Sequence, residues 1–308
     1  DCPNEVQLPD HVFLNGFQSD WDLPLCKLQR DELVDNAVSK GKLVALTKPE
    51  PADVFIIAVP TPLLSNRKPN LKYIKAAIRS IQKLIKKSDL IILESTSPVG
   101  TTEQICKWLA TNRKDLTFPH SHGTKADINV AHSPERVLPG NVLFEITQND
   151  RVIGGVSKHC AEKAKNLYKL ILKGRYHITD SRTAELVKLI ENAYRDTNIA
   201  FANELSLICD KLNIDCWEAI KLANHHPRVN ILKPGPGVGG HCIAIDPLFI
   251  VDSAPELTPL IQAARRVNDN KPKSILKDIK KSAKKFETPI ISCLGLAYKN
   301  DIDDLRES

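Results

Sequence analysis

A cysteine that follows a glycine-rich stretch is the residue of this sequence best suited to covalent chemistry. The stretch GPGVGGHCIAID, residues 235–246, places Cys242 between His241 and a run that ends at Asp246. The glycines before it are Gly235, Gly237, Gly239 and Gly240. Glycine lets a backbone approach a ligand closely, and consecutive N–H groups in such a loop form an anion-binding concavity. A thiol in that setting is held as the reactive thiolate, so the stretch predicts a nucleophilic cysteine.

An alternative is that Pro234 and Pro236 make a tight turn with the glycines and that Cys242 is simply a small buried residue. Free cysteine is among the most buried residue types. The choice between the two depends on the other polar residues of the chain.

Lys188 and Asn192 lie four residues apart in a segment that predicts a helix, so both lie on one face, with Arg195 about one turn further on. On helix spacing alone, the pair fits a functional face or the solvated edge of a surface helix.

Five further polar residues each have a functional and a structural interpretation. Glu135 and Asp246 are candidate site carboxylates, or a first-turn helix carboxylate and a turn residue, respectively. Thr96, with Ser95, follows an apolar run, and the pair are site hydroxyls or a helix cap. Arg228 is a ligand-binding cation or a surface ion-pair partner.

Buried strands that alternate with amphipathic helices must position these residues. The apolar runs predict strands at 53–60, 89–94, 128–132, 152–155 and 176–179. Amphipathic patterns predict helices at 30–41, at 71–87, from the end of the segment 95–102 to about 109, and at 160–172. The alternation predicts an α/β domain with a mostly parallel sheet, whose ligands bind beyond the carboxyl ends of the strands. The polar segments VPTP (59–62), STSPVGTT (95–102) and SPERVLPG (133–140) fall there.

After residue 180 the pattern becomes helical. Residues 182–212 contain no Gly or Pro and predict one helix of about 45 Å. It is too apolar for a lone surface helix, so it crosses the molecule or packs against a partner. Helices follow at 216–224 and 259–285, and PIISCLGLA (289–297) predicts a buried strand that opens another unit. Residues 1–30 read as irregular.

Composition narrows the class of protein. The chain has 308 residues, 42% of them hydrophobic and 26% charged, which is typical of a soluble globular protein. Eight cysteines without a CxxC pair predict neither a metal site nor a disulfide scaffold, and favour a reducing, cytoplasmic setting. The net charge of +6 is compatible with an anionic, phosphate-bearing substrate. The basic residues are not interleaved with aromatic ones, which disfavours nucleic-acid binding. No apolar run is long enough to span a membrane.

Five ordered motifs together resemble one family. They are STSPVGTT, SPERVLPG, ELVKLIENAYRDTNIAFANE, HPRVNILKPGPGVGGHCIAIDP and GLAYKNDIDDLRES. In this order and at these separations they resemble the UDP-glucose/GDP-mannose dehydrogenases, most of all the branch that acts on UDP-N-acetyl-D-mannosamine, with the UDP-N-acetylglucosamine 6-dehydrogenases nearby. The resemblance covers about residues 30–308.

The resemblance implies an NAD-dependent four-electron oxidation of a UDP-N-acetylhexosamine at C6, from alcohol to carboxylate. Cys242 would hold the aldehyde as a thiohemiacetal and then as a thioester that water hydrolyses. Lys188 and Asn192 match the pair on the family's long helix, Asp246 and Glu135 match its acid–base carboxylates, and Thr96 matches a hydroxyl that orders water.

The same resemblance implies binding residues and a partner. Substrate contacts are implied for Arg228, His241, Lys299, Gly235, Gly237, Gly239 and Gly240. Cofactor contacts are implied for Val59, Thr61, Thr96 and Arg306. Arg228 would reach a neighbouring subunit's site, and the long helix resembles the family's dimerisation helix, so a homodimer is expected.

The implied architecture has three parts. These are an NAD-binding Rossmann-like domain at 1–180, a helical dimerisation and catalytic domain at 181–286, and the beginning of a UDP-binding α/β domain at 287–308. Two departures from the family pattern stand out. Residues 1–30 supply no strand followed by GxGxxG, so a first βαβ unit is expected to be missing, and no C-terminal nucleotide-binding domain follows DLRES.

With Asp1 first and no methionine, the chain reads as a fragment, or as a processed or altered sequence, that binds NAD poorly. A catalytically silent dimerising homologue is one alternative. A nicotinamide-dependent 3-hydroxy acid dehydrogenase is another, although simple alcohol oxidation needs no cysteine.

Overall fold

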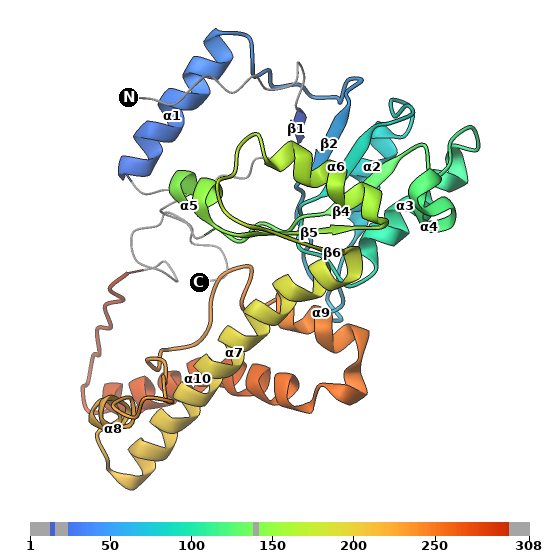
Figure 1. The fold of residues 1–308 in the computed structure, drawn as a ribbon. Helices are drawn as coiled ribbons and strands as arrows, with labels where there is room; N and C mark the ends of the chain where they lie inside the picture. The colour runs from blue at the N-terminus through green and yellow to red at the C-terminus, as the bar shows by residue number, and fades with distance from the viewer. Residues whose placement is uncertain (1–12, 16–23, 138–141, 296–308) are drawn as a thin grey trace. The chain divides into compact units, whose positions relative to one another are not determined.

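Six strands form one sheet in which spatial order follows chain order, β1-β2-β3-β4-β5-β6 (Figure 1). The computed structural model describes residues 13–15, 24–137 and 142–295. The strands are β1 (Phe13–Asn15), β2 (Val54–Ile57), β3 (Leu90–Leu93), β4 (Asn129–His132), β5 (Arg151–Gly155) and β6 (Tyr176–Asp180). Neighbouring strands are parallel except β4 and β5, which are antiparallel.

Strand β3 divides the core into two layers because side chains alternate along a strand. Ile91 and Leu93 lie in one apolar cluster with α2 (Lys72–Ile81) and α3 (Thr101–Asn112). Leu90 and Ile92 lie in a second cluster, with residues of α6 (Lys158–Tyr168). All four are buried, which explains why the run LIIL is apolar throughout rather than alternating.

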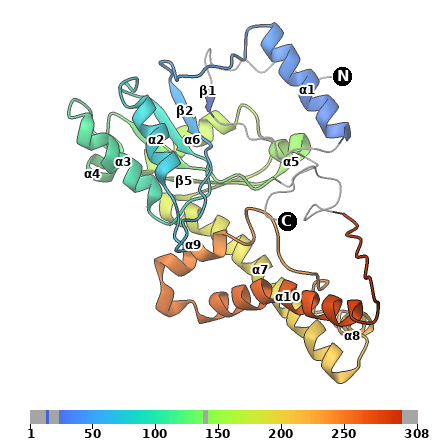
Figure 2. The same cartoon turned by 180° about the vertical axis from the view of Figure 1, so that it is seen from behind.

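The antiparallel step between β4 and β5 places α6 on the opposite face from α2 and α3, as can be followed in Figures 1 and 2. Crossovers between parallel strands are right-handed, so their helices change face when the strand direction reverses. The unit is completed by α1 (Pro24–Ser39), α4 (Pro119–His122), a 3₁₀ turn (Gly123–Lys125) and α5 (Val142–Gln148).

The helical part of the chain begins with α7 (Ser181–Leu212). The described chain divides into two units within this helix, the first ending at Lys188 and the second beginning at Leu189. The second unit also contains α8 (Cys216–Ala223), α9 (Asp246–Ser253), a 3₁₀ turn (Pro255–Leu257) and α10 (Pro259–Ala283). Helix α10 crosses α7 (Figure 2).

Buried polar side chains join α7 and α10. Asp196 Oδ1 accepts from Arg265 Nη1 at 2.5 Å and from Asn268 Nδ2 at 2.7 Å. Asn203 Nδ2 donates to Asn268 Oδ1 at 2.9 Å, and Lys271 Nζ donates to Ser206 Oγ at 2.5 Å. Burial raises the pKa of Asp196, although Arg265 opposes that shift. The spacing of these residues along both helices fixes the register of the crossing.

The mostly parallel sheet, in which β4 and β5 form the antiparallel pair, and the long helix are confirmed. Two expectations are corrected. Residues 1–30 are not wholly irregular, because β1 lies there and α1 begins at Pro24. Residues 289–295 form no strand, and Ile290 and Leu294 are 94% and 95% exposed. No strand lies beside them in the described chain, and an extended segment is stable as a strand only when its backbone groups are paired.

Within the described residues, no helix combines the length and apolarity that crossing a membrane requires.

Candidate active site

Three loops leave the same edge of the sheet, because β2, β3 and β4 are parallel neighbours. Ser95 Oγ accepts the N–H of Val59 at 2.7 Å and donates to the carbonyl of Ile57 at 3.2 Å. Thr61 Oγ1 donates to the carbonyl of Thr96 at 2.6 Å. The structure therefore brings together Val59, Thr61 and Thr96, as expected for residues of one ligand-binding edge. The helix-cap alternative for Ser95 and Thr96 is wrong, since the N-cap residue of α3 is Gly100.

Glu135, in the third of these loops, is held in place by the backbone of the two residues that follow it and by a buried arginine. Its Oε1 accepts the N–H groups of Arg136 and Val137 at 2.7 and 2.8 Å. Its Oε2 lies 3.3 Å from Arg151 Nη1, and Arg151 Nη2 in turn lies 2.5 Å from Glu94 Oε1. Glu135 is not in the first turn of a helix, so that alternative is wrong.

Arg151 can reach this edge because β5 runs antiparallel, so that its first residue lies where β3 and β4 end. The guanidinium also stacks over the Tyr168 ring, 4.3 Å from its centroid. Burial raises the pKa of Glu94, although Arg151 opposes the shift, and burial also raises the pKa of Tyr168. The arginine thus fixes two carboxylates, one of which is the predicted base Glu135.

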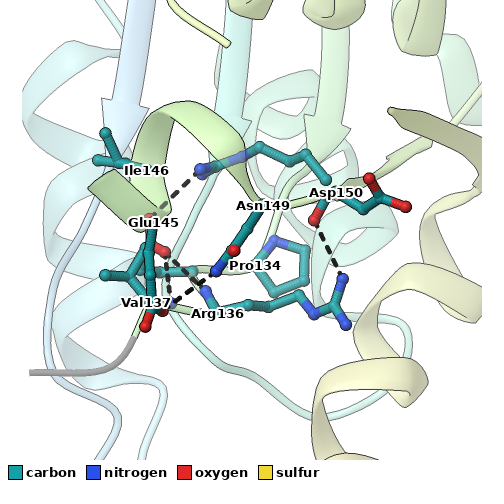
Figure 3. A pocket seen from close by; sticks show the side chains of 9 residues that line it. Pro134, Arg136, Val137, Glu145, Ile146, Asn149 and Asp150 are labelled. Atoms are coloured by element: carbon teal, nitrogen blue, oxygen red, sulfur yellow. Dashed lines mark hydrogen bonds and ion pairs between the residues drawn. The ribbon is translucent and has the colours of Figure 1, made fainter. Parts of the chain in front are cut away.

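A hollow lies beside this loop (Figure 3). Arg136 Nη1 donates to the carbonyl of Asp150 at 3.2 Å on one side of it, and Asn149 Nδ2 donates to Glu145 Oε2 at 3.1 Å on the other. Its lining combines charged and polar side chains with the apolar Pro134, Val137 and Ile146.

Helix α7 carries the predicted Lys188 and Asn192 into the interior. Asn192 is fully buried, its Nδ2 donates to Asp246 Oδ2, and its Oδ1 accepts from Arg195 Nη2. Lys188 is half-buried and makes no hydrogen bond or ion pair within the described chain. Asp246 is 3% exposed and is the first residue of α9. The solvated-edge and turn-residue alternatives are therefore wrong for Asn192 and Asp246.

The glycine-rich loop is anchored to both long helices of the second unit. The N–H of Gly235 donates to Asn203 Oδ1 on α7 at 2.9 Å. Gly237 lies so close to α10 that a Cβ at this position would be 2.9 Å from Pro272 Cγ. Gly240 has a φ of 84°, a conformation that favours glycine.

Cys242 is exposed at the end of this loop, so the alternative that it is a small buried residue is wrong. Its carbonyl accepts the N–H groups of Ile245 and Asp246 at 3.1 and 2.9 Å, which places the cysteine one turn before the buried Asp246. His241 and Gly239 are half-buried in the same loop. An exposed thiol beside a buried Asn–Asp pair is an arrangement that can perform nucleophilic and acid–base chemistry.

The remaining predicted residues are not brought to this loop by any contact. Arg228 is exposed, and its N–H donates to His226 Nδ1 at 3.3 Å. Lys299 and Arg306 lie outside the described residues. The meeting of Lys188 with Cys242 stays a prediction.

Sequence reasoning missed several residues that hold the site. Glu94 and Arg151 fix Glu135, Asn203 fixes Gly235, and Glu185 binds the loop that follows β3. Of these, Asn203 and Glu185 have a usable signal, because each lies 7 and 11 residues from the pair Asn192 and Asp196, which places both on the same face of α7. Among the described residues, no group of three or more His, Cys, Asp and Glu side chains is arranged to hold a metal ion.

Comparison with known proteins identifies the chain. The model of the UDP-glucose/GDP-mannose dehydrogenase family NAD binding domain matches residues 19–172, and the model of the family's central domain matches residues 182–270. The chain belongs to this family. The first matched region contains β2 to β5 with their helices, and the second contains α7 to α9, the loop with Cys242 and the first part of α10.

Curated relatives in the family are similar over most of the chain. An NDP-N-acetyl-D-galactosaminuronic acid dehydrogenase of Ralstonia nicotianae is 60% identical over 278 residues, covering 90% of this chain and 66% of the relative. A UDP-N-acetyl-D-mannosamine dehydrogenase of Campylobacter jejuni is 60% identical over 279 residues, covering 90% and 69%. The chain thus spans about two thirds of the length of these relatives.

A solved structure from the family has the same fold. The UDP-D-ManNAc dehydrogenase from Pyrococcus horikoshii is 42% identical, with a TM-score of 0.82 over 90% of this chain and 66% of that one.

Proposed function

We propose that this chain carries the catalytic centre of an NAD-dependent enzyme that oxidises C6 of a UDP-N-acetylhexosamine from alcohol to carboxylate. The observation that supports this most is the exposed thiol of Cys242, one turn before the buried Asp246 that bonds Asn192. The family membership and the names of the relatives supply the reaction class and the nucleotide sugar.

In this proposal Cys242 divides the oxidation into two steps. The alcohol first loses a hydride and a proton to give an aldehyde. The Cys242 thiolate then adds to the aldehyde carbon, giving a thiohemiacetal that loses the second hydride to become a thioester. Water attacks the thioester, releasing the carboxylate and regenerating the thiol. Each oxidation removes two electrons, so one sugar reduces two NAD molecules.

The other residues of the proposed centre hold protons or charge. Lys188 stabilises the oxyanion on the reacting oxygen, with Asn192 donating beside it. Asp246 and Glu135 accept and return protons, and Thr96 orders the hydrolytic water. Asn192 is suited to this role because Arg195 and Asp246 occupy both ends of its amide and fix its orientation.

Two NAD molecules, bound one after the other, would each accept one hydride. The described residues fit part of this cofactor, because Val59, Thr61 and Thr96 lie together at the carboxyl edge of parallel strands, where α/β sheets bind nucleotides. The Ser97 hydroxyl, in the same loop, is buried and has no partner in the described chain, so this edge retains an unused hydrogen-bonding group. Arg306 is proposed as a further contact.

The nucleotide sugar is proposed to bind the glycine-rich loop through Gly235, Gly237, Gly239, Gly240 and His241, with Lys299 and with Arg228 of a second subunit. An exposed Arg228 without an ion-pair partner in the described chain is available for such a role. The diphosphate of the nucleotide is the group that a cation recognises.

UDP-N-acetyl-D-mannosamine is the sugar that we propose first, and UDP-N-acetyl-D-glucosamine is the alternative among its epimers. The 60% identity to an NDP-N-acetyl-D-galactosaminuronic acid dehydrogenase favours a galacto-configured sugar as a second candidate. The orientation of one hydroxyl or acetamido group separates these sugars, and pocket shape decides between them.

The stoichiometry of NADH tests the proposal. The purified protein is incubated with excess NAD and a limiting amount of each UDP-N-acetylhexosamine, and NADH is read at completion. Two NADH per sugar are expected. One NADH per sugar would point to simple alcohol oxidation, and none with any of the sugars would favour a silent homologue.

We also propose that the chain forms a homodimer through α7. Ile190, Tyr194 and Phe201 of this helix are 50%, 69% and 52% exposed, which is unusual for large apolar side chains on one helix. Light scattering during size-exclusion chromatography should give twice the chain mass of 34.3 kDa. Introducing a charge with Tyr194→Glu should shift the protein to the monomer.

A further inference from the structure

Helix α7 inserts a buried carboxylate into the N-terminus of α3. Glu185 is 1% exposed, and its Oε2 accepts the N–H of Gly100 at 2.5 Å. Its Oε1 accepts the N–H and the hydroxyl of Thr102 at 2.7 and 2.6 Å. The first N–H groups of a helix have no partner within the helix, so Glu185 satisfies donors that α3 cannot satisfy itself.

The carboxylate is well matched to this position. The N-terminus of a helix carries a partial positive charge, which stabilises an anion there. Burial raises the pKa of Glu185, while the bonds from Thr102 and Gly100 act in the opposite direction. All three contacts are from donors, so a side-chain amide at this position would direct an N–H group at another donor.

The contact links two segments of the proposed centre. Gly100, the N-cap of α3, ends the loop that contains Thr96, and Thr102 lies in the first turn of α3 directly after it. The carbonyl of Thr96 accepts from Thr61 of the neighbouring loop. Glu185 lies three residues before Lys188, so the two side chains lie on the same face of α7, one turn apart. These residues all belong to the first of the two units.

Within the part of the chain that the structure describes, the other ion pair between α3 and α7 is weak. Arg182 Nη1 lies 3.6 Å from Glu103 Oε2, but the two side chains are 58% and 35% exposed, and exposed ion pairs of this kind contribute little. The first turn of α7 also packs closely against Gly154 of β5 through Ala184, and Glu185 supplies the buried polar contact that sets this end of α7 with respect to the segment that follows Thr96.

We propose that Glu185 is a positioning residue that fixes the Lys188 ammonium with respect to the Thr96 loop. The inference rests on the proposed function, because it gives Lys188 and Thr96 a shared reaction. A displacement of about 1 Å at a reacting group lowers turnover about 100-fold, so even a small shift of α7 is visible in kcat.

The test compares Glu185→Gln with Glu204→Gln, a matched change at an exposed position of the same helix. Glu185→Gln should lower kcat at least tenfold with less than a threefold change in KM for the UDP-sugar. Glu204→Gln should leave both unchanged. Thr102→Val removes only the hydroxyl donor and should give a smaller loss in kcat than Glu185→Gln. In the double variant Thr102→Val/Glu185→Gln, the valine should add little to the loss caused by Glu185→Gln alone.

A second readout does not depend on turnover. Competitive acetylation followed by peptide mass spectrometry measures the reactivity of Lys188 against that of Lys211, which is exposed on the same helix. In Glu185→Gln the reactivity of Lys188 should change at least threefold, and that of Lys211 should stay the same. Should Glu185→Gln fail to fold, Thr102→Val gives the same comparison with two of the three bonds intact.

The inference is overturned if Glu185→Gln only lowers the melting temperature, with kcat per folded molecule and Lys188 reactivity as in Glu204→Gln. Failure of the proposed function looks different. In that case the parent protein forms no NADH with any UDP-sugar, while the Lys188 labelling still reports whether Glu185 positions it.

Discussion

Replacing Gly237 by alanine should destabilise the protein, because this glycine lies against a rigid part of α10. The added Cβ would lie 2.9 Å from Pro272 Cγ and 3.3 Å from Pro272 Cδ. Ordinary contacts between carbon atoms are about 3.5–4.0 Å, so the new methyl group overlaps the ring by about 0.5–1 Å. The proline ring is fixed within a helix and has no flexible end that can move aside.

The size of the effect follows from the overlap. Forcing an extra methyl group into a packed interior costs about 1–3 kcal/mol, and part of it is relieved if the loop moves away from α10. Gly235, two residues earlier, is the matched control. A Cβ there would meet its nearest atom at 3.9 Å, and the amide that bonds Asn203 would be unchanged. Gly235→Ala should therefore leave stability within about 0.5 kcal/mol of the parent, the usual range for a substitution that creates no new contact.

Urea unfolding followed by far-ultraviolet circular dichroism measures both variants. The expected result is a midpoint lowered for Gly237→Ala and almost unchanged for Gly235→Ala, with equal slopes against urea concentration. Equal midpoints for the two variants would show that the loop does not lie against Pro272 in solution, and the reasoning about how Cys242 is held would be refuted.

Three further variants test other parts of the structure. Arg265→Met leaves the buried Asp196 without its ion-pair partner and should lower the free energy of unfolding by about 3–5 kcal/mol in urea titrations. That loss should be larger at pH 8 than at pH 5. The pKa of Asp196 is raised in the folded protein, so ionisation of this carboxyl group lowers the free energy of unfolding as the pH rises. Burial lowers the pKa of His132 to about 3, so this residue's contribution to stability is complete above pH 6.5 and is lost as the pH falls. The parent should therefore lose about 1.4 kcal/mol per pH unit between pH 6 and 4 that His132→Leu does not lose, and parallel urea midpoints for the two proteins would contradict this. Ser157→Ala removes the hydroxyl that caps α6 at the N–H of Cys160 and should lower the free energy of unfolding by about 1 kcal/mol, whereas no change would mean that water replaces this cap.

Much of the sheet was predictable because its strands are buried on both faces. The run LIIL of β3 is apolar at every position, and such a run indicates a buried strand without any knowledge of its neighbours. The direction of β5 was not predictable, since RVIGG is buried throughout whichever way it runs. PIISCLGLA has the same apolar character, yet residues 289–295 have no strand to pair with in the described chain. Composition indicates that a segment can be a strand, and only pairing makes it one.

The candidate site was predictable where chemistry restricts residue type. Cys242 and Asp246 were identified from a glycine-rich stretch, and their spacing places them one turn apart in the structure. The residues that hold the site were not identified. Arg151 looks in sequence like an ordinary surface charge, and the spacing that places Glu185 on the inner face of α7 does not identify its partner. The importance of Glu185 and Arg151 comes from partners 83 and 57 residues away along the chain. Contacts at such separations leave no local pattern.

The covalent step at Cys242 is tested most directly by peptide mass spectrometry. The protein is mixed with UDP-N-acetyl-D-mannosamine and NAD, quenched with acid during turnover and digested. The proposal predicts that the peptide containing Cys242, and no other cysteine peptide, gains the mass of the UDP-sugar acyl group. Steady formation of the uronate, with this peptide unmodified and with Cys242→Ala turning over at the parent's rate, would contradict it.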